Sequence, residues 1–427
     1  MAELQTLPYV DIQHDALAVF DDVSQGVVAQ ENVWMSCYKL GENSIHGKMT
    51  LSRDGEAVQG VDITCSKEVD VERKSHIPLS INAVDISPDG SQLVYGGPDG
   101  YCYVHPLSHS TSPPLELKGH VGDVLDVKWF PSGSVVLTAS TDSTIRIFSS
   151  DSGINPRTLK GHKRAVTALG ILGVGKNVVS GSKDGTVKLW DVSKGVCLTS
   201  FYTEGFAGVE KIALGNQAQV IRNSTATGRA ETTDDDHFQP KHLDGEIAAD
   251  THDKLLFAGL SSSAGNIALY DIASKQPIFS AFPHVPTSTA SSPTFPRSAS
   301  GGAIHSITYH ADRFLLASGS AKGVVVVRDV RMLDKDGAGA LHIFRRTEAP
   351  INDLAFVTAS SLETSIDLVL APESGLPCRI GIPHDVGGLV TCVEEYAGWE
   401  PLSIESVSVG QEGQVWVAGA EGGIRRY

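Results

Sequence analysis

The chain has 427 residues, with 34 lysines and arginines against 50 aspartates and glutamates, so its formal net charge is −16. A chain of this length can bury a large core without disulfides or metal ions as staples. Its negative surface repels the phosphates of nucleic acids and of anionic membranes, which leaves basic proteins as the favoured partners.

The N-terminal residues contain no sign of a secretory leader. Residues 1–15 carry neither a basic start nor an apolar run, and no apolar stretch in the chain reaches the length of about 18 residues that spans a bilayer. The six cysteines are scattered, without a CxxC pair or a histidine at zinc-ligand spacing. We expect free thiols, no metal, no cofactor and a soluble protein of a reducing compartment.

A repeated strand start organises most of the chain. It is an apolar residue followed three positions later by another, and it begins at Ile81, Val124, Val166, Val209, Ile304, Ile351 and Ile404. Turn signals of the Asp-Gly type recur between these starts, as at Asp99-Gly100 and Asp184-Gly185. Seven short units of this kind predict an all-β fold, a seven-bladed WD-repeat β-propeller.

Two of the units align almost without gaps. His120 and His162 both follow a glycine and lie 42 positions apart, as do Asp142 and Asp184. A period near 40 with Gly-His, a turn aspartate and Trp-Asp is the signature of a four-stranded propeller blade.

Side chains within these units form a predicted structural network. We expect His162, a strand serine (Ser180 or Ser182), Asp184 and Trp190 to be linked by hydrogen bonds, each contributing about 1 kcal/mol, with His120 and Asp142 in the same roles one unit earlier. A Ser-His-Asp hydrolase is the alternative interpretation. Because the trio recurs in successive units whereas an enzyme builds one site, we predict a structural role and no catalytic residues.

A second apparent active-site motif spans residues 170–177. Gly170, Gly175 and Lys176 have the GxxxxGK spacing of a phosphate-binding loop, but Asn177 stands where such a loop needs a serine or threonine for magnesium. The alignment of the units places this segment at a turn between strands. We interpret it as that turn.

The interval between Val209 and Ile304 is too long for one unit. It contains two polar segments, about 217–253 and 283–302, which we predict to be solvated, mobile insertions in the propeller. The alternative is an eighth, degenerate blade that starts near Ile247.

The last unit ends at Tyr427 directly after its third strand. An open propeller would expose a sheet edge, so the missing outermost strand must come from the N-terminal side. We predict that Val61–Cys65 supplies it. The domain division is then an N-terminal extension, 1–58, packed on the ring it helps to close, and a propeller, 59–427.

Several segments resemble the proteasomal ATPase-associated factor family. They are LKGHVGDVLDVKWFPSGSVVLTAS, LKGHKRAVTALGILGVGKNVVSGSKDGTVKLWD, the WMSC of Trp34–Cys37, VDITCSK from Val61 and the terminal GGIRRY. The resemblance runs from Trp34 to Tyr427, although Phe148 replaces one blade tryptophan and later units lack most Gly-His pairs. It implies a non-enzymatic chaperone that binds a proteasomal AAA-type ATPase subunit during assembly of the regulatory-particle base.

Carboxylates near the inner strand starts are the candidate partner-binding residues. They are Asp123, Glu210, Asp353 and Glu405, with Glu421 in a turn on the same rim. We expect them to bind lysines or arginines of the C-terminal domain of the ATPase; scattered solubilising charge is the alternative. We expect a monomer of the cytoplasm and nucleus. A second functional reading is a substrate receptor or scaffold in a ubiquitin ligase or a chromatin-associated complex.

Overall fold

The structure is a computed structural model that describes most of the chain. The described residues are 2–13, 15–52, 62–65, 67–69, 80–107, 113–216, 251–357, 365–383, 385, 388–397, 399 and 402–427. Within them the regular structure is mostly β-strand, with one helix of ten residues, α1 (Ala16–Gln25), and a short one, α2 (Thr287–Ala290). Single 3-10 turns lie at Pro98–Gly100, Glu204–Phe206, Arg297–Ala299 and Val330–Met332.

Seven sheets of four or five strands are present in the described residues, and we number them I to VII in chain order. Sheet I contains β7 (Ala83–Ile86), β8 (Gln92–Gly96), β9 (Cys102–Pro106) and β10 (Leu115–Glu116). Sheet II contains β11 (Val124–Trp129), β12 (Val135–Ser140), β13 (Thr144–Ser149) and β14 (Arg157–Lys160). Sheet III contains β15 (Val166–Leu172), β16 (Asn177–Ser182), β17 (Thr186–Asp191) and β18 (Val196–Tyr202).

Sheets IV to VII follow the same order from the innermost strand outward. They are β19 (Val209–Asn216), β20 (Lys254–Leu260), β21 (Asn266–Asp271) and β22 (Gln276–Pro283); β23 (Ile304–His310), β24 (Leu315–Ser320), β25 (Val324–Asp329) and β26 (Ala340–Arg345), joined by β1 (Leu4–Thr6); β27 (Ile351–Val357), β28 (Ser365–Pro372), β29 (Cys378–Pro383) and β30 (Thr391–Ala397), joined by β5 (Asp62–Cys65); and β31 (Ile404–Val409), β32 (Val415–Gly419) and β33 (Ile424–Arg426), joined by β6 (Lys67–Val69).

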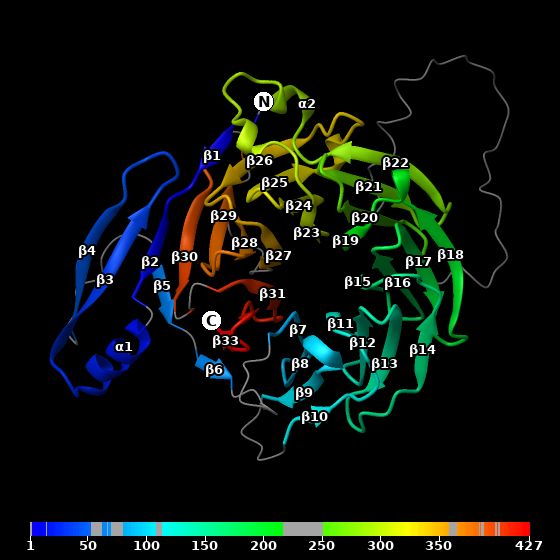
Figure 1. Ribbon diagram of the computed structural model, residues 1–427, viewed down its shortest axis with the longest axis horizontal. Helices are drawn as coiled ribbons and strands as arrows, with labels where there is room; N and C mark the ends of the chain where they lie inside the picture. Colours follow the sequence, from blue (N-terminus) through cyan, green and yellow to red (C-terminus); the bar gives the residue numbers. More distant parts are fainter. Residues whose placement is uncertain are drawn as a thin grey trace.

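The innermost strands of the sheets follow one another around a central axis (Figure 1). β7 contacts β11, and the contacts continue through β15, β19, β23 and β27 to β31, which contacts β7 again. Apolar side chains fill the space between neighbouring sheets: Val179 of sheet III packs with Leu256 of sheet IV, and Trp416 of sheet VII packs with Tyr95 of sheet I. This arrangement of antiparallel four-stranded sheets is a β-propeller.

The predicted strand starts are confirmed at almost every position. Six of the seven coincide with the first residue of an innermost strand, and Ile81 lies two residues before β7, where its N–H donates to the carbonyl of Gly419. The start that would belong to an eighth unit, Ile247, lies outside the described residues. On either side of that gap, β19 and β20 are neighbours in a single sheet.

The prediction that Val61–Cys65 supplies the missing outermost strand of the last sheet is wrong. Asp62–Cys65 forms β5, which runs parallel to β30 at the outer edge of sheet VI, and Val61 lies outside the described residues. The strand that completes sheet VII is β6, which pairs antiparallel with β33. An outermost strand pairs along one edge only, so the local sequence does not identify which sheet it joins.

Residues before β5 are attached to the rim of the ring. β1 is a parallel fifth strand on β26, the N–H of Leu7 donates to the carbonyl of Arg345 at 2.9 Å, and Gln5 Oε1 accepts from the N–H of Val390 at 3.0 Å. The N-terminal segment therefore bridges sheets V and VI. Beyond it, β2 (Tyr9–Ile12), β3 (Gln30–Tyr38) and β4 (Ile45–Ser52) form a small sheet that contacts α1 and lies outside the ring (Figure 1).

The interpretation of 283–302 as a solvated insertion is also wrong. Val285, Phe295 and Ala299 are buried against Val324 and Val326 of β25. Three apolar side chains spaced among serines, threonines and prolines are enough to dock the segment, although its average composition is polar. For the other predicted insertion, 217–253, residues 217–250 lie outside the described residues, and 251–253 form the turn before β20.

The docking of the N-terminal strand can be tested through Leu7. Its side chain is 6% exposed and packs in the same cluster as Phe344 and Ile351. We expect Leu7→Ala to lower the free energy of unfolding by about 2 kcal/mol, because it removes buried methyl groups and leaves a cavity. Urea unfolding measures the change. Leu40→Ala, at a 38% exposed position, is the matched control, and equal effects of the two variants would contradict the described packing.

Candidate functional site

One face of the propeller carries two kinds of connection. The loops from each outermost strand to the next innermost strand lie beside the turns between the second and third strands. Two backbone hydrogen bonds show this: the N–H of Lys183 donates to the carbonyl of Ala165, and the N–H of Thr141 donates to the carbonyl of Asp123. We call this the crossover face. It holds the candidate binding site.

A β-bulge shapes the opening of the central channel on the crossover face. In six sheets the pairing of the innermost strand with its neighbour shifts directly after the first residue, which leaves one residue unpaired. The unpaired residues are Leu125, Thr167, Glu210, His305, Asn352 and Glu405. All six line an opening of about 410 Å³, which we call the mouth. The bulge is the local device that turns these side chains toward the axis.

Three of the five predicted partner-binding carboxylates meet at the mouth. Asp123, Glu210 and Glu405 all line it, and they come from sheets or loops far apart in the chain. Asp123 Oδ1 accepts a hydrogen bond from the N–H of Asp99 at 3.1 Å, and Glu210 is paired with Lys183. The lining of the mouth therefore contains three carboxylates and two lysines, Lys183 and Lys211, and Lys183 already pairs with Glu210.

The other two predicted carboxylates lie elsewhere and have structural contacts. Asp353 lies deeper, where its Oδ2 accepts from the N–H of Val407 at 3.0 Å and from Ser406 Oγ at 3.2 Å. Glu421 pairs with Arg425 four residues later at 3.4 Å and does not line the mouth. The structure thus brings together three of the five residues.

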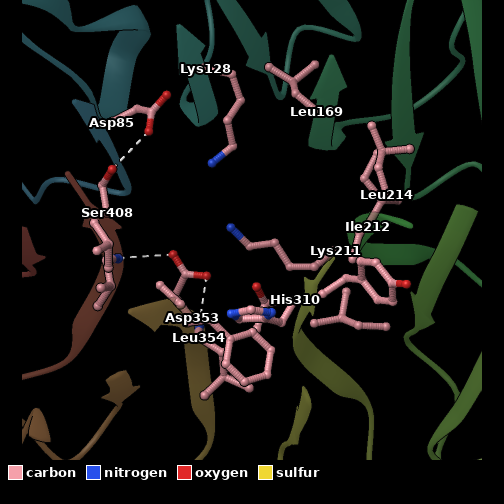
Figure 2. A pocket seen from close by; sticks show the side chains of 18 of the residues that line it. Asp85, Lys128, Leu169, Lys211, Ile212, Leu214, His310, Asp353, Leu354 and Ser408 are labelled. Carbon is pink, nitrogen blue, oxygen red and sulfur yellow. Dashed lines mark hydrogen bonds between the residues drawn. The ribbon is translucent and has the colours of Figure 1, made fainter. Parts of the chain in front are cut away.

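Below the mouth the central channel contains a cavity of about 520 Å³ (Figure 2). Carboxylates on its wall connect neighbouring innermost strands: Asp85 accepts from the N–H of Trp129 at 2.8 Å, and Asp126 accepts from the N–H of Leu169 at 2.7 Å. Asp353 makes the equivalent bond to β31. Asp85 and Asp126 were not among the predicted residues, although both stand on predicted strands where an acidic residue is unusual.

The channel brings aspartates and lysines close together: Asp85, Asp126, Asp312 and Asp353 line the cavity with Lys128 and Lys211. Burial raises the pKa of Asp85 above its ordinary value. Burial opposes the charge of Lys128, but the carboxylates of Asp85, Asp126 and Asp353 outweigh that effect and raise its pKa. The ammonium groups of Lys128 and Lys211 both extend into the cavity (Figure 2). Because the carboxylates already accept backbone and hydroxyl hydrogen bonds, their geometry suits holding strands together.

The predicted blade network is present in sheets II and III. Trp190 Nε1 donates to Ser180 Oγ at 2.8 Å, Ser180 Oγ lies 2.8 Å from His162 Nε2, and His162 Nδ1 lies 2.9 Å from Asp184 Oδ2. The serine is therefore Ser180; Ser182 instead donates to the carbonyl of Arg164. Burial lowers the pKa of His162 and so favours the neutral imidazole, which in this chain of bonds carries its proton on Nδ1.

In sheet II a threonine takes the serine position. His120 Nδ1 lies 2.8 Å from Asp142 Oδ2, and His120 Nε2 lies 2.8 Å from Thr138 Oγ1. Phe148 occupies the position of the tryptophan and is fully buried, so packing replaces its hydrogen bond. Both networks tie a loop of the crossover face to the inner strands.

Sheet V replaces the network with a buried cation. Arg328 on β25 takes the register position of Trp190, and its guanidinium donates to the carbonyl of His284, whose Nε2 lies 3.0 Å from the carbonyl of Ser318. Burial lowers the pKa of Arg328 to about 9, and burial together with Arg328 lowers the pKa of His284 to about 3. The sequence signal was an arginine before Asp329 in place of the tryptophan.

One group of potential metal ligands occurs in the described residues. The ligand atoms of Cys378, Cys392 and Glu395 lie within 4.8 Å of one another on β29 and β30. Glu395 is already paired with the buried guanidinium of Arg346. The hydrogen bond with Cys378, together with burial, raises the pKa of Cys392, which opposes the thiolate that a metal ion needs. The cluster is better explained as a buried ion pair next to two thiols.

Comparison with known proteins identifies the repeats. The model of the WD domain, G-beta repeat, matches residues 71–105, 111–149 and 153–191. The chain is also similar to the serine-threonine kinase receptor-associated protein of Dictyostelium discoideum, with 34% identity over 73 residues, and to the Denticleless protein homolog of Gallus gallus, with 39% identity over 64 residues.

These matches establish a WD-repeat protein. They cover 17% and 15% of this chain, and 24% and 9% of the two relatives respectively, so the chain spans only a small part of either relative. Among the described residues, none of the helices has the length and apolar character needed to cross a membrane.

The histidine networks predict a pH dependence of stability. Burial lowers the pKa of His162 and of His120 below their ordinary value of 6.5. The unfolded chain therefore takes up protons at a higher pH than the folded chain, and stability is lost as the pH falls below about 6.5, by up to about 1.4 kcal/mol per pH unit for each such histidine.

His162→Gln tests this origin. We expect it to lower the free energy of unfolding at pH 7.5 by about 1–2 kcal/mol, because it breaks the bonds to Ser180 and Asp184. We also expect a shallower loss of stability between pH 7 and pH 5 than in the wild type, measured by urea unfolding at each pH. Parallel pH profiles of the two proteins would show that His162 does not titrate as described.

Proposed function

We propose that this WD-repeat protein is a seven-bladed propeller that assists assembly of the proteasome regulatory-particle base. In this proposal sheets I to VII are the blades. The protein is not an enzyme and acts as a monomer in the cytoplasm and nucleus. Its partner is the C-terminal domain of a proteasomal AAA-type ATPase subunit. The resemblance of its repeats and of its N-terminal and C-terminal segments to the proteasomal ATPase-associated factor family supports the choice of partner.

The observation that carries the proposal is the convergence of Asp123, Glu210 and Glu405 at the mouth. Two of them are bulge residues, so the fold itself turns them toward the axis. Carboxylates on a rigid rim, in a protein with a net charge of −16, attract basic partners and accelerate their association.

The absence of catalysis in this proposal rests on how the polar groups are used. Asp85, Asp126 and Asp353 accept hydrogen bonds from neighbouring innermost strands. The histidines of sheets II and III are bonded on both ring nitrogens. Groups engaged in this way hold the blades together and are poorly placed to exchange protons with a substrate.

Reversing the three mouth carboxylates tests the proposal. We expect Asp123→Lys, Glu210→Lys and Glu405→Lys together to weaken binding to the ATPase C-terminal domain about 10-fold to 100-fold at low salt, mainly through slower association. Surface plasmon resonance against each isolated ATPase C-terminal domain, at several salt concentrations, measures the change. The wild type should bind one of these domains and lose affinity as salt is raised.

A matched variant carries the same change of charge on the opposite face. Asp151, Asp336 and Glu412 are exposed in turns away from the crossover face, and their triple replacement by lysine should leave affinity almost unchanged. Equal losses in the two triple variants would mean that net charge alone drives binding. Failure of the wild type to bind any ATPase domain would reject the proposed partner and favour the ubiquitin-ligase or chromatin reading.

A further inference from the structure

The loop between sheets III and IV departs from the repeat. Where the preceding loops carry Gly-His, this one reads Thr203-Glu204-Gly205-Phe206, with a 3-10 turn at Glu204–Phe206. No histidine points inward from it. The loop instead presents Phe206 to solvent with 67% of its surface exposed, next to Tyr202 at 63%.

Phe206 is held in an unfavourable backbone conformation. Its φ is +54°, in the left-handed region that bulky residues rarely adopt. Such strain persists only where the surroundings enforce it, and residues of this kind gather at functional sites.

Contacts within the loop enforce the conformation. Thr203 is buried, and its N–H donates to the carbonyl of Gly185 at 3.0 Å while its hydroxyl lies 2.7 Å from the carbonyl of Ala207. The N–H of Phe206 donates to the carbonyl of Thr203 at 3.1 Å. At Gly185 an added Cβ would lie 2.6 Å from the carbonyl oxygen of Phe206, so the turn between β16 and β17 packs directly on this backbone.

The two exposed rings form a pair. The centroids of Tyr202 and Phe206 lie 6.1 Å apart with an interplanar angle of 81°, an edge-to-face contact. Glu204, also exposed, lies between them in the sequence. Two paired aromatic rings on a loop that also carries an exposed carboxylate form a surface suited to a cation with a flat apolar face.

The same chain contains a filled version of this arrangement. Phe314 also has a positive φ, +56°, and the guanidinium of Arg331 lies 5.3 Å from its ring centroid. Asp329 accepts three hydrogen bonds from that guanidinium, at 2.6, 2.9 and 3.1 Å. Ring, guanidinium and carboxylate are thus all supplied internally at Phe314, whereas the ring of Phe206 is exposed.

We infer that Tyr202 and Phe206 bind an arginine side chain of a basic protein partner, with Glu204 as its carboxylate. The net charge of −16 and the three mouth carboxylates on the same face make a basic segment the complementary occupant. The inference rests on the proposed function for the identity of the partner, and it adds the anchor residue and its chemistry. Aromatic anchors of this kind dominate the affinity of many interfaces.

Phe206→Gly separates binding from folding. Glycine adopts a positive φ without strain, so we expect the thermal midpoint of the variant to equal or exceed that of the wild type. Affinity for the ATPase C-terminal domain should nevertheless fall at least about 10-fold, as expected for loss of an interface anchor. Val174→Ala, at a 70% exposed apolar position in a turn on the opposite face, should change neither quantity.

A second measurement does not depend on the ATPase. In isothermal titration calorimetry with a hepta-arginine peptide, the wild type should bind more tightly than Phe206→Gly and Glu204→Gln, and Val174→Ala should match the wild type. If the wild type binds no ATPase domain but retains this difference, the proposed function fails and the arginine site stands. If the wild type binds the ATPase and the mouth variants weaken binding while Phe206→Gly does not, or if the peptide does not distinguish the variants, the arginine site is overturned.

Discussion

Mutual burial of neighbouring sheets around a closed ring is the constraint on which the rest of the structure depends. A single four-stranded sheet of this size cannot cover both of its faces, so each one packs against two neighbours, and the last must pack against the first. Trp416 and Ile424 of sheet VII share a cluster with Leu93 and Tyr95 of sheet I, which completes the circle. The strand that finishes sheet VII, β6, comes from a segment more than 300 residues earlier in the chain. Folding therefore couples the two ends of the chain.

The N-terminal residues extend this coupling over several sheets. β1 lies on sheet V, β5 on sheet VI and β6 on sheet VII, in the order in which the chain reaches them. Each addition covers an edge that would otherwise present unpaired backbone groups. The extension is thus part of the structure that closes the propeller. A boundary near residue 58 does not separate two independent structural units, because β1 lies before it and pairs with a propeller sheet.

Ring closure also separates structural positions from positions free to bind. Carboxylates on the channel wall and the histidine networks are occupied by bonds between or within blades. Bulge residues at the top of the innermost strands have no partner in the ladder. Thr167 and Asn352 use their side chains to bond the carbonyls of Val209 and Ile404 in the next sheet, whereas Glu210 and Glu405 bring charge to the mouth. The departures from the repeat follow the same division: Arg328 replaces a tryptophan inside sheet V, whereas Phe206 replaces nothing that the blade requires and lies at the surface.

The sequence by itself determined the fold class, six of the seven innermost strand starts, and the network of His162, Asp184 and Trp190 with either Ser180 or Ser182, because these depend on local periodicity and on side chains that recur at a fixed spacing. The structure decided that the serine is Ser180. The sequence also placed Asp123, Glu210 and Glu405 near strand starts. Only the tertiary structure decided that these three meet at one mouth while Asp353 and Glu421 do not, because that depends on bulges and on contacts between strands far apart in the chain. For the same reason, only the tertiary structure decided that Lys67–Val69 closes the ring and that 283–302 is packed. The position of an outer strand or a docked loop depends on its contacts with distant residues, and the local composition gives no information about those contacts.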